Sequence, residues 1–142
     1  MVAIRIRRVA LGTLAGGIFW VVWTRIIDNV ILPSKYNFAI AHQTMLRQSR
    51  YPHFNVWWYL MLILLTYILT WVYVCVRTTL GPGPITALRV GLLIGFAMSF
   101  PFSFLLAGWM PISRVIAFWW MLMMWVGAIV ATLISAWLYK EA

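Results

Sequence analysis

Residues 56–76 form an uncharged, strongly apolar run, and this run constrains the fold more than any other feature of the chain. Aromatic side chains bracket it, with Trp57 near its start and Trp71 and Tyr73 near its end. A helix rises about 1.5 Å per residue, so a run of this length crosses the roughly 30 Å hydrocarbon core of a bilayer. Tryptophan and tyrosine favour the two membrane–water interfaces. The run therefore predicts a transmembrane helix.

The composition of the chain supports the same assignment. Of its 142 residues, 65% are hydrophobic, and 11 basic and 2 acidic residues carry the charge. These charged residues are too few to cover the surface of a soluble domain. The basic residues lie singly between apolar runs, which is typical of loop anchors that contact lipid headgroups. We therefore expect membrane lipids as partners and no nucleic acid, since no basic patch exists to bind phosphates.

Three further apolar segments predict three more membrane helices. The predicted helices cover residues 9–32, 56–76, 89–110 and 114–139. Pro33 is expected to end the first helix, because proline lacks the backbone N–H that a helix interior needs. Residues 111–113 make a turn so tight that the last two helices lie antiparallel and adjacent. The chain is thus predicted to be all-α, a single transmembrane domain over residues 1–142 that folds as a four-helix bundle.

The connection between the first two helices is the only long one. Within it, residues 37–50 place Phe38 and Met45 on one helical side, and Arg47 and Arg50 largely on the other. This pattern predicts a short amphipathic helix in the membrane interface. The alternative is an irregular polar loop.

The distribution of basic residues predicts the orientation. Loops on the cytoplasmic side of a membrane carry an excess of lysine and arginine. The cluster of Arg5, Arg7 and Arg8 gives the side of the N-terminus a slim excess. We therefore expect both termini to face the cytoplasm.

Small residues recur at four-residue spacing in three of the predicted helices, so that in each helix they fall on one face. They are Gly12, Gly16, Gly91, Gly95, Gly127 and Ala131. In lipid, helices associate by close backbone approach, which small residues permit. We expect these faces to close the bundle internally. The alternative is that one of them docks a partner protein.

Arg25, Asp28 and Asn29 form the strongest polar cluster in the predicted membrane segments. Arg25 and Asp28 are three residues apart, share a helix face and can form an ion pair. An ionisable residue within a membrane segment is a functional candidate. The alternative is a structural pair at the end of the first helix, with Arg25 reaching the headgroups.

Pro101 lies inside the third predicted helix and is expected to kink it, because it removes a backbone hydrogen bond. The hydroxyl of Ser99 or Ser103 can bond the carbonyl that the proline leaves free. Such kinks occur at transport sites and also in purely structural helices, and both interpretations stay open.

Trp125 lies near the middle of the fourth predicted helix, close to Met121. A tryptophan at that depth packs against something, and a flat apolar cofactor such as a quinone or pigment would suit it. Trp125 and Met121 are therefore the candidates for cofactor binding. The alternative is that Trp125 fills the bundle or faces lipid.

The sequence offers few combinations of residues that could catalyse a reaction. No nucleophile–base pair and no pair of carboxylates within the predicted helices is recognisable. The two histidines, His42 and His53, fall in the long connection outside the predicted membrane helices, and Cys75 is the only cysteine. We therefore expect no enzyme, no metal site and no obligatory cofactor, with a bound lipid, pigment or quinone as the alternative.

Part of the chain resembles a known group of proteins. Residues 11–17, Leu-Gly-Thr-Leu-Ala-Gly-Gly, followed by Trp23 and Ile31-Leu32-Pro33, are similar to the first helix of a group of small uncharacterised bacterial membrane proteins. The ending at residues 136–140, Ala-Trp-Leu-Tyr-Lys, is similar to theirs as well. The resemblance implies a four-helix protein of the bacterial inner (cytoplasmic) membrane. The long basic loop departs from the pattern, and the group has no assigned activity to carry over.

These observations favour a non-catalytic accessory or structural subunit of a larger membrane protein complex, because the loops are short and catalytic groups are missing. Two alternatives remain open. One is a small oligomeric transporter or channel that uses Arg25, Asp28 and Pro101. The other is a binding protein for an apolar cofactor near Trp125. The helix at residues 56–76, which has no small-residue face, is expected to be the wall that faces lipid or a partner.

Overall fold

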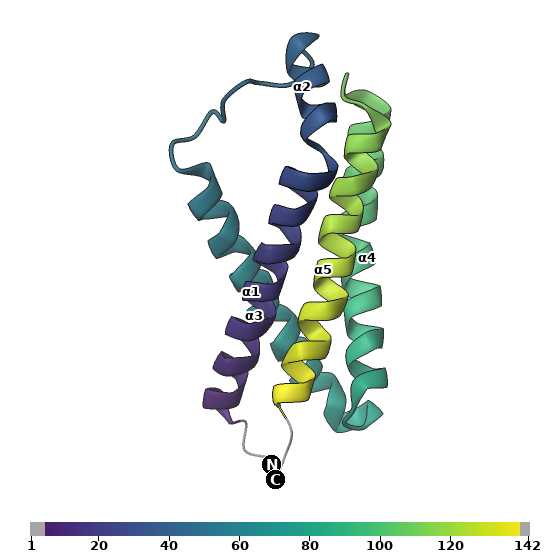
Figure 1. The fold of residues 1–142 in the computed structure, drawn as a ribbon. Helices are drawn as coiled ribbons and strands as arrows, with labels where there is room; N and C mark the ends of the chain where they lie inside the picture. The colour runs from purple at the N-terminus through teal and green to yellow at the C-terminus, as the bar shows by residue number, and fades with distance from the viewer. Residues whose placement is uncertain (1–4, 140–142) are drawn as a thin grey trace.

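The computed structural model describes residues 5–139, and within that range the chain is helical with no strand. The elements are α1 (Ile6–Ile26), the π-helix η1 (Ile27–Ile31), α2 (Pro33–Ala41), α3 (Phe54–Leu80), α4 (Pro84–Trp109) and α5 (Arg114–Leu138). Four segments are long and apolar enough to span a membrane: Ile6–Ile31, Phe54–Leu80, Pro84–Trp109 and Arg114–Leu138. They form one bundle (Figure 1), and the predicted all-α fold with four membrane helices is confirmed.

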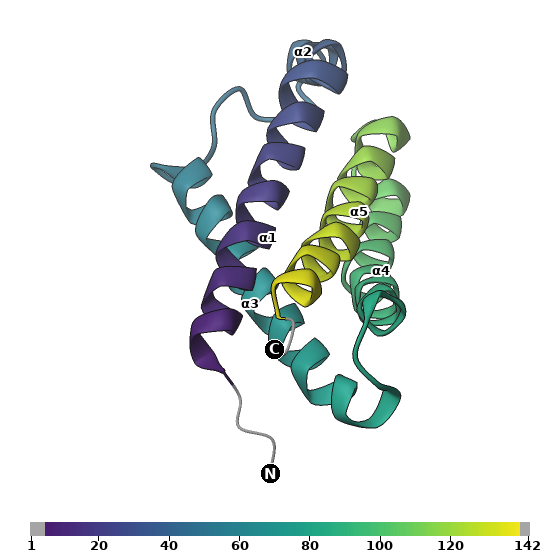
Figure 2. The ribbon, with the colours of Figure 1, turned by 60° about the horizontal axis from the view of Figure 1, so that its bottom comes forward.

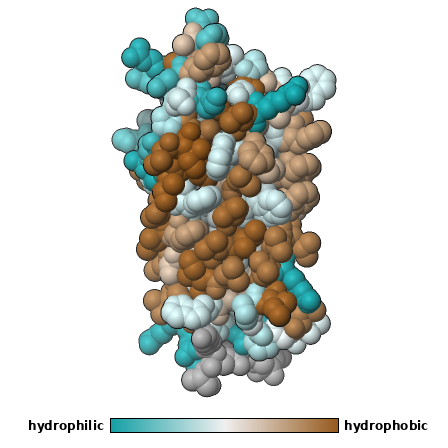
Figure 3. Space-filling view, turned by 45° about the vertical axis from the view of Figure 1, so that its right-hand side comes forward, coloured by the Kyte–Doolittle hydropathy of each residue, from teal (hydrophilic) through white to brown (hydrophobic). Residues whose placement is uncertain are grey.

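The surface of the bundle matches that of a multi-pass membrane protein. In Figure 3, apolar side chains cover most of the length of the visible face, and strongly polar side chains gather mainly toward its two ends. Such a surface places the apolar band in the hydrocarbon core and the polar ends among the headgroups.

Helix α5 packs extensively against both α4 and α1, and glycines set how closely the backbones approach. A Cβ on Gly91 of α4 would lie 2.7 Å from the Cα of Ile129. A Cβ on Gly16 of α1 would lie 2.8 Å from the carbonyl oxygen of Ala131. Real side chains do not tolerate such contacts, so these positions need glycine for the helices to meet as they do.

Trp20 of α1 also packs against a glycine of α5, in this case with a large side chain. A Cβ on Gly127 would overlap the Trp20 indole, whose N–H donates to the carbonyl oxygen of Met123 at 3.1 Å. Trp20 is fully buried, although it is the largest type of side chain. The gap left by Gly127 is what admits this ring between α1 and α5.

Helix α3 differs from the outer wall that its sequence predicts. In its C-terminal half, the hydroxyl of Thr70 donates to the hydroxyl of Ser135 at 3.0 Å. The Ser135 hydroxyl in turn donates to the carbonyl oxygen of Gly12 at 3.0 Å, which links α3, α5 and α1 inside the bundle. The N-terminal end of α3 stands apart from α1 in both Figure 1 and Figure 2. The expectation was therefore wrong for the buried C-terminal half, because the threonine there faces inward.

The interfacial helix lies earlier in the chain than predicted. Leu32 N–H donates to the carbonyl oxygen of Ile27 at 3.0 Å, a π-type turn that carries the chain past the end of α1. Pro33 then begins α2 rather than ending the helical path, because the first position of a helix needs no N–H. A left-handed backbone at Gln43 (φ 57°) follows the end of α2. The predicted helix over 37–50 is thus wrong beyond Ala41.

The end of the bundle opposite α2 is closed by a cluster around Arg77. The Arg77 guanidinium donates to the carbonyl oxygen of Tyr139 at 3.2 Å and lies 4.9 Å from the centroid of the Tyr139 ring. Tyr73 lies on another side of the same guanidinium, with its ring centroid 6.0 Å away. The backbone N–H of Arg5 donates to the Tyr139 hydroxyl at 3.3 Å, so the two ends of the described chain meet here.

Replacing Gly91 by alanine tests the close packing of α4 on α5. We expect Gly91→Ala to lower the free energy of unfolding by about 1–3 kcal/mol, because the added methyl group must push the backbone of α5 away. The measurement is unfolding of the purified protein in detergent, followed by circular dichroism. Gly108→Ala is the matched control, since Gly108 lies on the same helix with nothing within 4 Å of its Cβ position. Equal stability of the two variants would contradict the packing argument.

Candidate functional site

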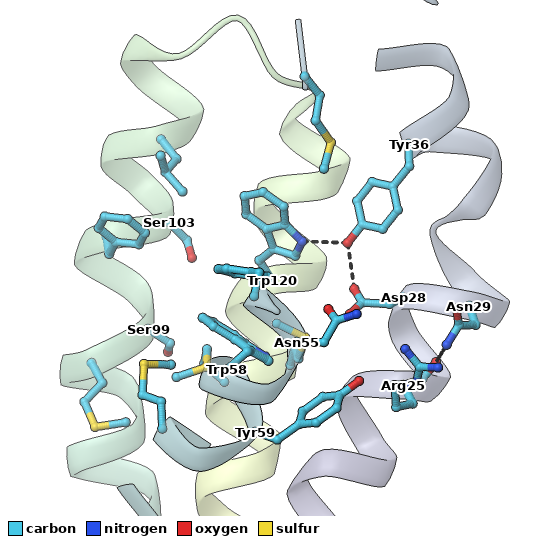
Figure 4. Close-up of a pocket in the computed structure, with 18 residues that line it drawn as sticks. Arg25, Asp28, Asn29, Tyr36, Asn55, Trp58, Tyr59, Ser99, Ser103 and Trp120 are labelled. Atoms are coloured by element: carbon cyan, nitrogen blue, oxygen red, sulfur yellow. Dashed lines mark hydrogen bonds between the residues drawn. The ribbon is translucent and has the colours of Figure 1, made fainter. Parts of the chain in front are cut away.

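A cavity of about 660 Å³ lies toward the α2 end of the bundle. It is bounded by α1 and η1 on one side, by α4 on the other, and by α2, α5 and the N-terminal part of α3 (Figure 4). Small-molecule sites in proteins typically enclose roughly 300–1,000 Å³. The volume and the mixed lining make this cavity the candidate functional site.

A chain of two hydrogen bonds crosses one side of the cavity. The indole N–H of Trp120 donates to the Tyr36 hydroxyl at 2.8 Å, and that hydroxyl donates to Oδ1 of Asp28 at 2.7 Å. Figure 4 shows both bonds, which join α5, α2 and η1. The π-turn makes the arrangement possible, because it leads the chain from Asp28 over Pro33 and brings Tyr36 back above the carboxylate.

Tyr36 keeps its proton in this setting. Burial raises the pKa of the Tyr36 hydroxyl above its ordinary value, because the phenolate would lose its hydration. The bond from Trp120 acts in the opposite direction, while the bond to Asp28 and the charge of that carboxylate raise the pKa further. The neutral hydroxyl therefore remains a donor to Asp28 and holds its orientation.

Arg25 and Asp28 both line the cavity, but the structure records no ion pair within 4.0 Å for either of these two described side chains. Asp28 instead takes its hydrogen bond from Tyr36. Asn29, the third residue of the predicted polar cluster, also lines the cavity and donates to the backbone carbonyl of Arg25 at 2.9 Å. The three residues thus form a polar wall that contains two opposite charges.

Most of the remaining lining residues are aromatic or are methionines, and Asn55 and Leu106 also line the cavity. Phe54 and Trp58 of α3 stack with ring centroids 5.9 Å apart, and both line the cavity. Five methionines, from four different parts of the chain, also line it: Met45, Met61, Met98, Met123 and Met124. Methionine side chains are flexible and polarisable, so such walls adapt to apolar ligands of different shape.

Ser99 and Ser103 line the cavity from α4, opposite the charged wall (Figure 4). Ser99 is only 2% exposed, and its hydroxyl has no hydrogen-bond partner. An unpartnered buried hydroxyl costs about 1–3 kcal/mol. The sequence offered Ser99 or Ser103 as the residue that bonds the carbonyl left free by Pro101. The Ser99 hydroxyl does not make this bond. Pro101 itself is exposed within α4.

Trp125 and Met121, the predicted cofactor-binding candidates, lie outside the lining of this cavity. The indole N–H of Trp125 donates to the carbonyl oxygen of Leu92 at 3.1 Å, and its ring meets Phe96 edge-on at 5.5 Å. Trp125 also covers Gly95, whose Cβ would lie 3.0 Å from it. It therefore fills the contact between α5 and α4.

The small residues predicted to pack are all at contacts between helices. Gly12 meets Ser135, Gly95 meets Ala128, and Gly16, Gly91, Gly127 and Ala131 take part in the contacts described above. Within residues 5–139, no group of three or more His, Cys, Asp or Glu side chains is placed so that it could hold a metal ion.

Comparisons of the chain with protein-family models, with curated proteins and with solved structures found no match.

Removing the Tyr36 hydroxyl tests the hydrogen-bond chain. Tyr36→Phe leaves both the Asp28 carboxylate and the Trp120 indole N–H without this partner, so we expect a loss of about 1–3 kcal/mol in the free energy of unfolding. Tyr67→Phe on the exposed side of α3 is the matched control. The measurement is chemical unfolding in detergent. A Tyr36→Phe protein as stable as the control would show that the chain contributes nothing to the fold.

Proposed function

We propose that this protein reversibly binds a small apolar molecule that carries a polar group. The observation that supports this most strongly is the cavity of about 660 Å³ with apolar walls and a few fixed polar groups, a combination typical of small-molecule sites. An apolar cofactor near Trp125 is one alternative that the sequence leaves open. The proposed ligand is also largely apolar, but its cavity is not lined by Trp125.

The groups around the cavity favour binding over catalysis and transport. Asp28 is the one carboxyl group that lines it, and acid–base chemistry generally needs a second group of matched pKa. At the other end of the bundle, Tyr73, Arg77 and Tyr139 pack together, which favours a closed binding site over a through-channel. We therefore propose a non-enzymatic protein.

A second candidate function, an accessory subunit of a larger membrane complex, is supported by the outer face of α4. Phe96, Phe100 and Phe104 stack there in a row, with successive ring centroids 4.9 Å and 5.9 Å apart, and all three are exposed. A stacked aromatic row suits a helix of a partner subunit as well as it suits lipid. Purification in a mild detergent tests this: a stoichiometric larger complex is expected if the candidate is correct, and a single species without other subunits contradicts it.

The membrane and the orientation are proposals as well. The resemblance of residues 11–17 and 136–140 supports the bacterial inner membrane, and the arginines at the N-terminus support cytoplasmic termini. With that orientation, the end of the bundle that bears α2 and the cavity would face away from the cytoplasm.

Saturable photolabelling tests the binding site. The probe is an alkyl diazirine with an ester group, added to the full chain in lipid nanodiscs, and labelled peptides are identified by mass spectrometry. We expect labelling around Trp58, Met98 and Met124 that excess unlabelled probe suppresses, whereas labelling of the outer face at Leu93 persists. Labelling that is uniform and not suppressible would contradict a binding site.

A pair of substitutions on α5 makes the test specific to the cavity. Met124→Trp replaces a flexible side chain of the lining with a bulky indole ring that fills part of the cavity. It is expected to reduce the suppressible labelling at least several-fold. Met121→Trp is the matched control, because Met121 is a partly buried methionine of the same helix that does not line the cavity. Loss of labelling in both variants would point to a general change in the bundle, so a thermal-unfolding scan accompanies each.

Ser99→Ala tests whether the Ser99 hydroxyl is buried without a partner. Because the hydroxyl has no partner, its removal is expected to leave the free energy of unfolding unchanged or to raise it by about 1 kcal/mol. The same change is expected to leave binding of the ester-bearing probe unchanged, since the hydroxyl oxygen is buried away from the cavity surface. The measurement is the probe concentration that gives half-maximal suppressible labelling. Ser34→Ala, at an exposed position in α2, is the control. Lower stability or weaker probe binding in Ser99→Ala would contradict a hydroxyl that is buried without a partner.

A further inference from the structure

The cavity is lined by two opposite charges, Arg25 and Asp28, that form no ion pair within 4.0 Å. Arg25 belongs to the last turn of α1 and Asp28 to η1, and Asp28 is one of only two acidic residues in the chain. Oδ1 of Asp28 accepts the bond from Tyr36, which leaves capacity for further partners at the carboxylate. The half-buried carboxylate of Asp28 is costly in a membrane segment unless a positive group or water lies close to it, whereas the Arg25 side chain is exposed. A molecule with one positive and one negative group would satisfy both residues at once.

The surroundings of Asp28 suit a positively charged amine. Trp58, Tyr59 and Trp120 line the cavity beside it, and Figure 4 shows their rings between the charged wall and α4. The faces of aromatic rings attract ammonium groups, and most strongly where water is excluded. The bond from the Tyr36 hydroxyl fixes the carboxylate, so that it does not swing away when the cavity is empty.

The surroundings of Arg25 suit an anionic oxygen group. A guanidinium binds phosphate through two parallel hydrogen bonds, and its side chain is long enough to reach the headgroup region from the end of a membrane helix. Arg25 lies near the end of the membrane span Ile6–Ile31 and its side chain is exposed. Its position thus matches the depth at which the phosphates of membrane lipids lie.

The remaining walls suit a hydrocarbon chain. Beyond the charged wall, the lining consists mainly of the methionines and aromatic rings of α3, α4 and α5. These flexible and flat surfaces accept an extended chain without a fixed shape.

We propose that the cavity holds a zwitterionic phospholipid, with its ammonium group against Asp28 and the aromatic rings, its phosphate against Arg25, and one acyl chain among the methionines. This inference rests on the proposed function, because it names the ligand of the same cavity. It adds a requirement that the binding proposal does not make, namely that the amine of the headgroup is recognised.

Native mass spectrometry of the full chain in detergent tests the headgroup. The protein is offered equal amounts of phosphatidylethanolamine and phosphatidylglycerol with identical acyl chains. These lipids share the phosphate and the chains but differ in the amine. We expect the first bound lipid to be phosphatidylethanolamine with a preference of about fivefold, the effect of one charge contact near a membrane surface. No preference, or a preference for phosphatidylglycerol, would overturn the proposal.

Variants assign the preference to the two charges. Asp28→Asn is expected to abolish the preference for the amine, and Asp28→Glu, which keeps the charge, is expected to retain most of it. Arg25→Gln should weaken binding of both lipids while the preference for phosphatidylethanolamine persists. If Asp28→Asn fails to fold, the comparison of Asp28→Glu with Arg25→Gln still tests which charge recognises the amine. Arg114→Gln is the matched control, since Arg114 is an exposed arginine near the start of α5 that does not line the cavity. A preference that survives Asp28→Asn would refute the proposal.

Two further measurements complete the test. One distinguishes a lipid from a soluble zwitterion, and the other distinguishes failure of the headgroup proposal from failure of the binding function. Soluble phosphocholine and micellar dodecylphosphocholine are offered as competitors, and only the second, which carries a chain, is expected to displace the lipid. Displacement by phosphocholine alone would overturn a lipid ligand in favour of a soluble one. If photolabelling of the cavity is saturable and no headgroup is preferred, the headgroup proposal fails and the binding function stands. If saturable labelling is absent, both fail.

Discussion

The close approach of backbones along α5 is the contact on which the rest of the bundle depends. In lipid, apolar side chains gain little by leaving one apolar environment for another, so helices are held by dense packing and by hydrogen bonds between them. Gly91 and Gly16 provide that packing from α4 and α1, on two sides of α5. The hydroxyls of Thr70 and Ser135 then attach α3 to the same helix. Helix α5 therefore acts as the central element of the fold.

The cavity follows from an uneven distribution of side-chain size along these contacts. Small residues such as Gly12 and Ser135 face each other toward the closed end, where α3 also joins the bundle. Toward the α2 end, the corresponding space is taken by large rings, including those of Trp58 and Trp120, and the N-terminal part of α3 diverges. Large rings on diverging helices leave gaps that other side chains do not fill. The same packing that closes one end thus leaves a cavity at the other.

Much of this architecture was predictable from the sequence, because hydrophobic runs and four-residue spacing of glycine report local periodicity. The cavity was not, because it depends on residues that meet only in three dimensions. Tyr36 reaches Asp28 across Pro33, and the sequence alone did not indicate that Pro33 begins a helix after a π-turn rather than ending one. Trp120 was indistinguishable from the other tryptophans of the interface until its N–H was seen to reach Tyr36. Trp125, in contrast, stood out by its depth, yet depth does not reveal whether a ring faces a ligand or a neighbouring helix.

The polar groups of the cavity are expensive features in a protein of this kind, and their positions argue for a common purpose. The Ser99 hydroxyl has no partner, and the half-buried Asp28 carboxylate has the Tyr36 hydroxyl as its hydrogen-bond donor; polar groups of this kind cost free energy in a membrane. If they served only the fold, replacing them by apolar side chains would improve it, as is commonly found for polar groups without full partners. Arg25, Asp28 and Ser99 line one cavity, whereas the unpartnered buried polar atoms of Thr13, Trp23 and Thr24 lie elsewhere in the bundle. The tight packing along α5 stabilises the bundle enough to offset the free-energy cost of these polar groups. The closely packed end of the bundle therefore allows the polar cavity to exist at the other end.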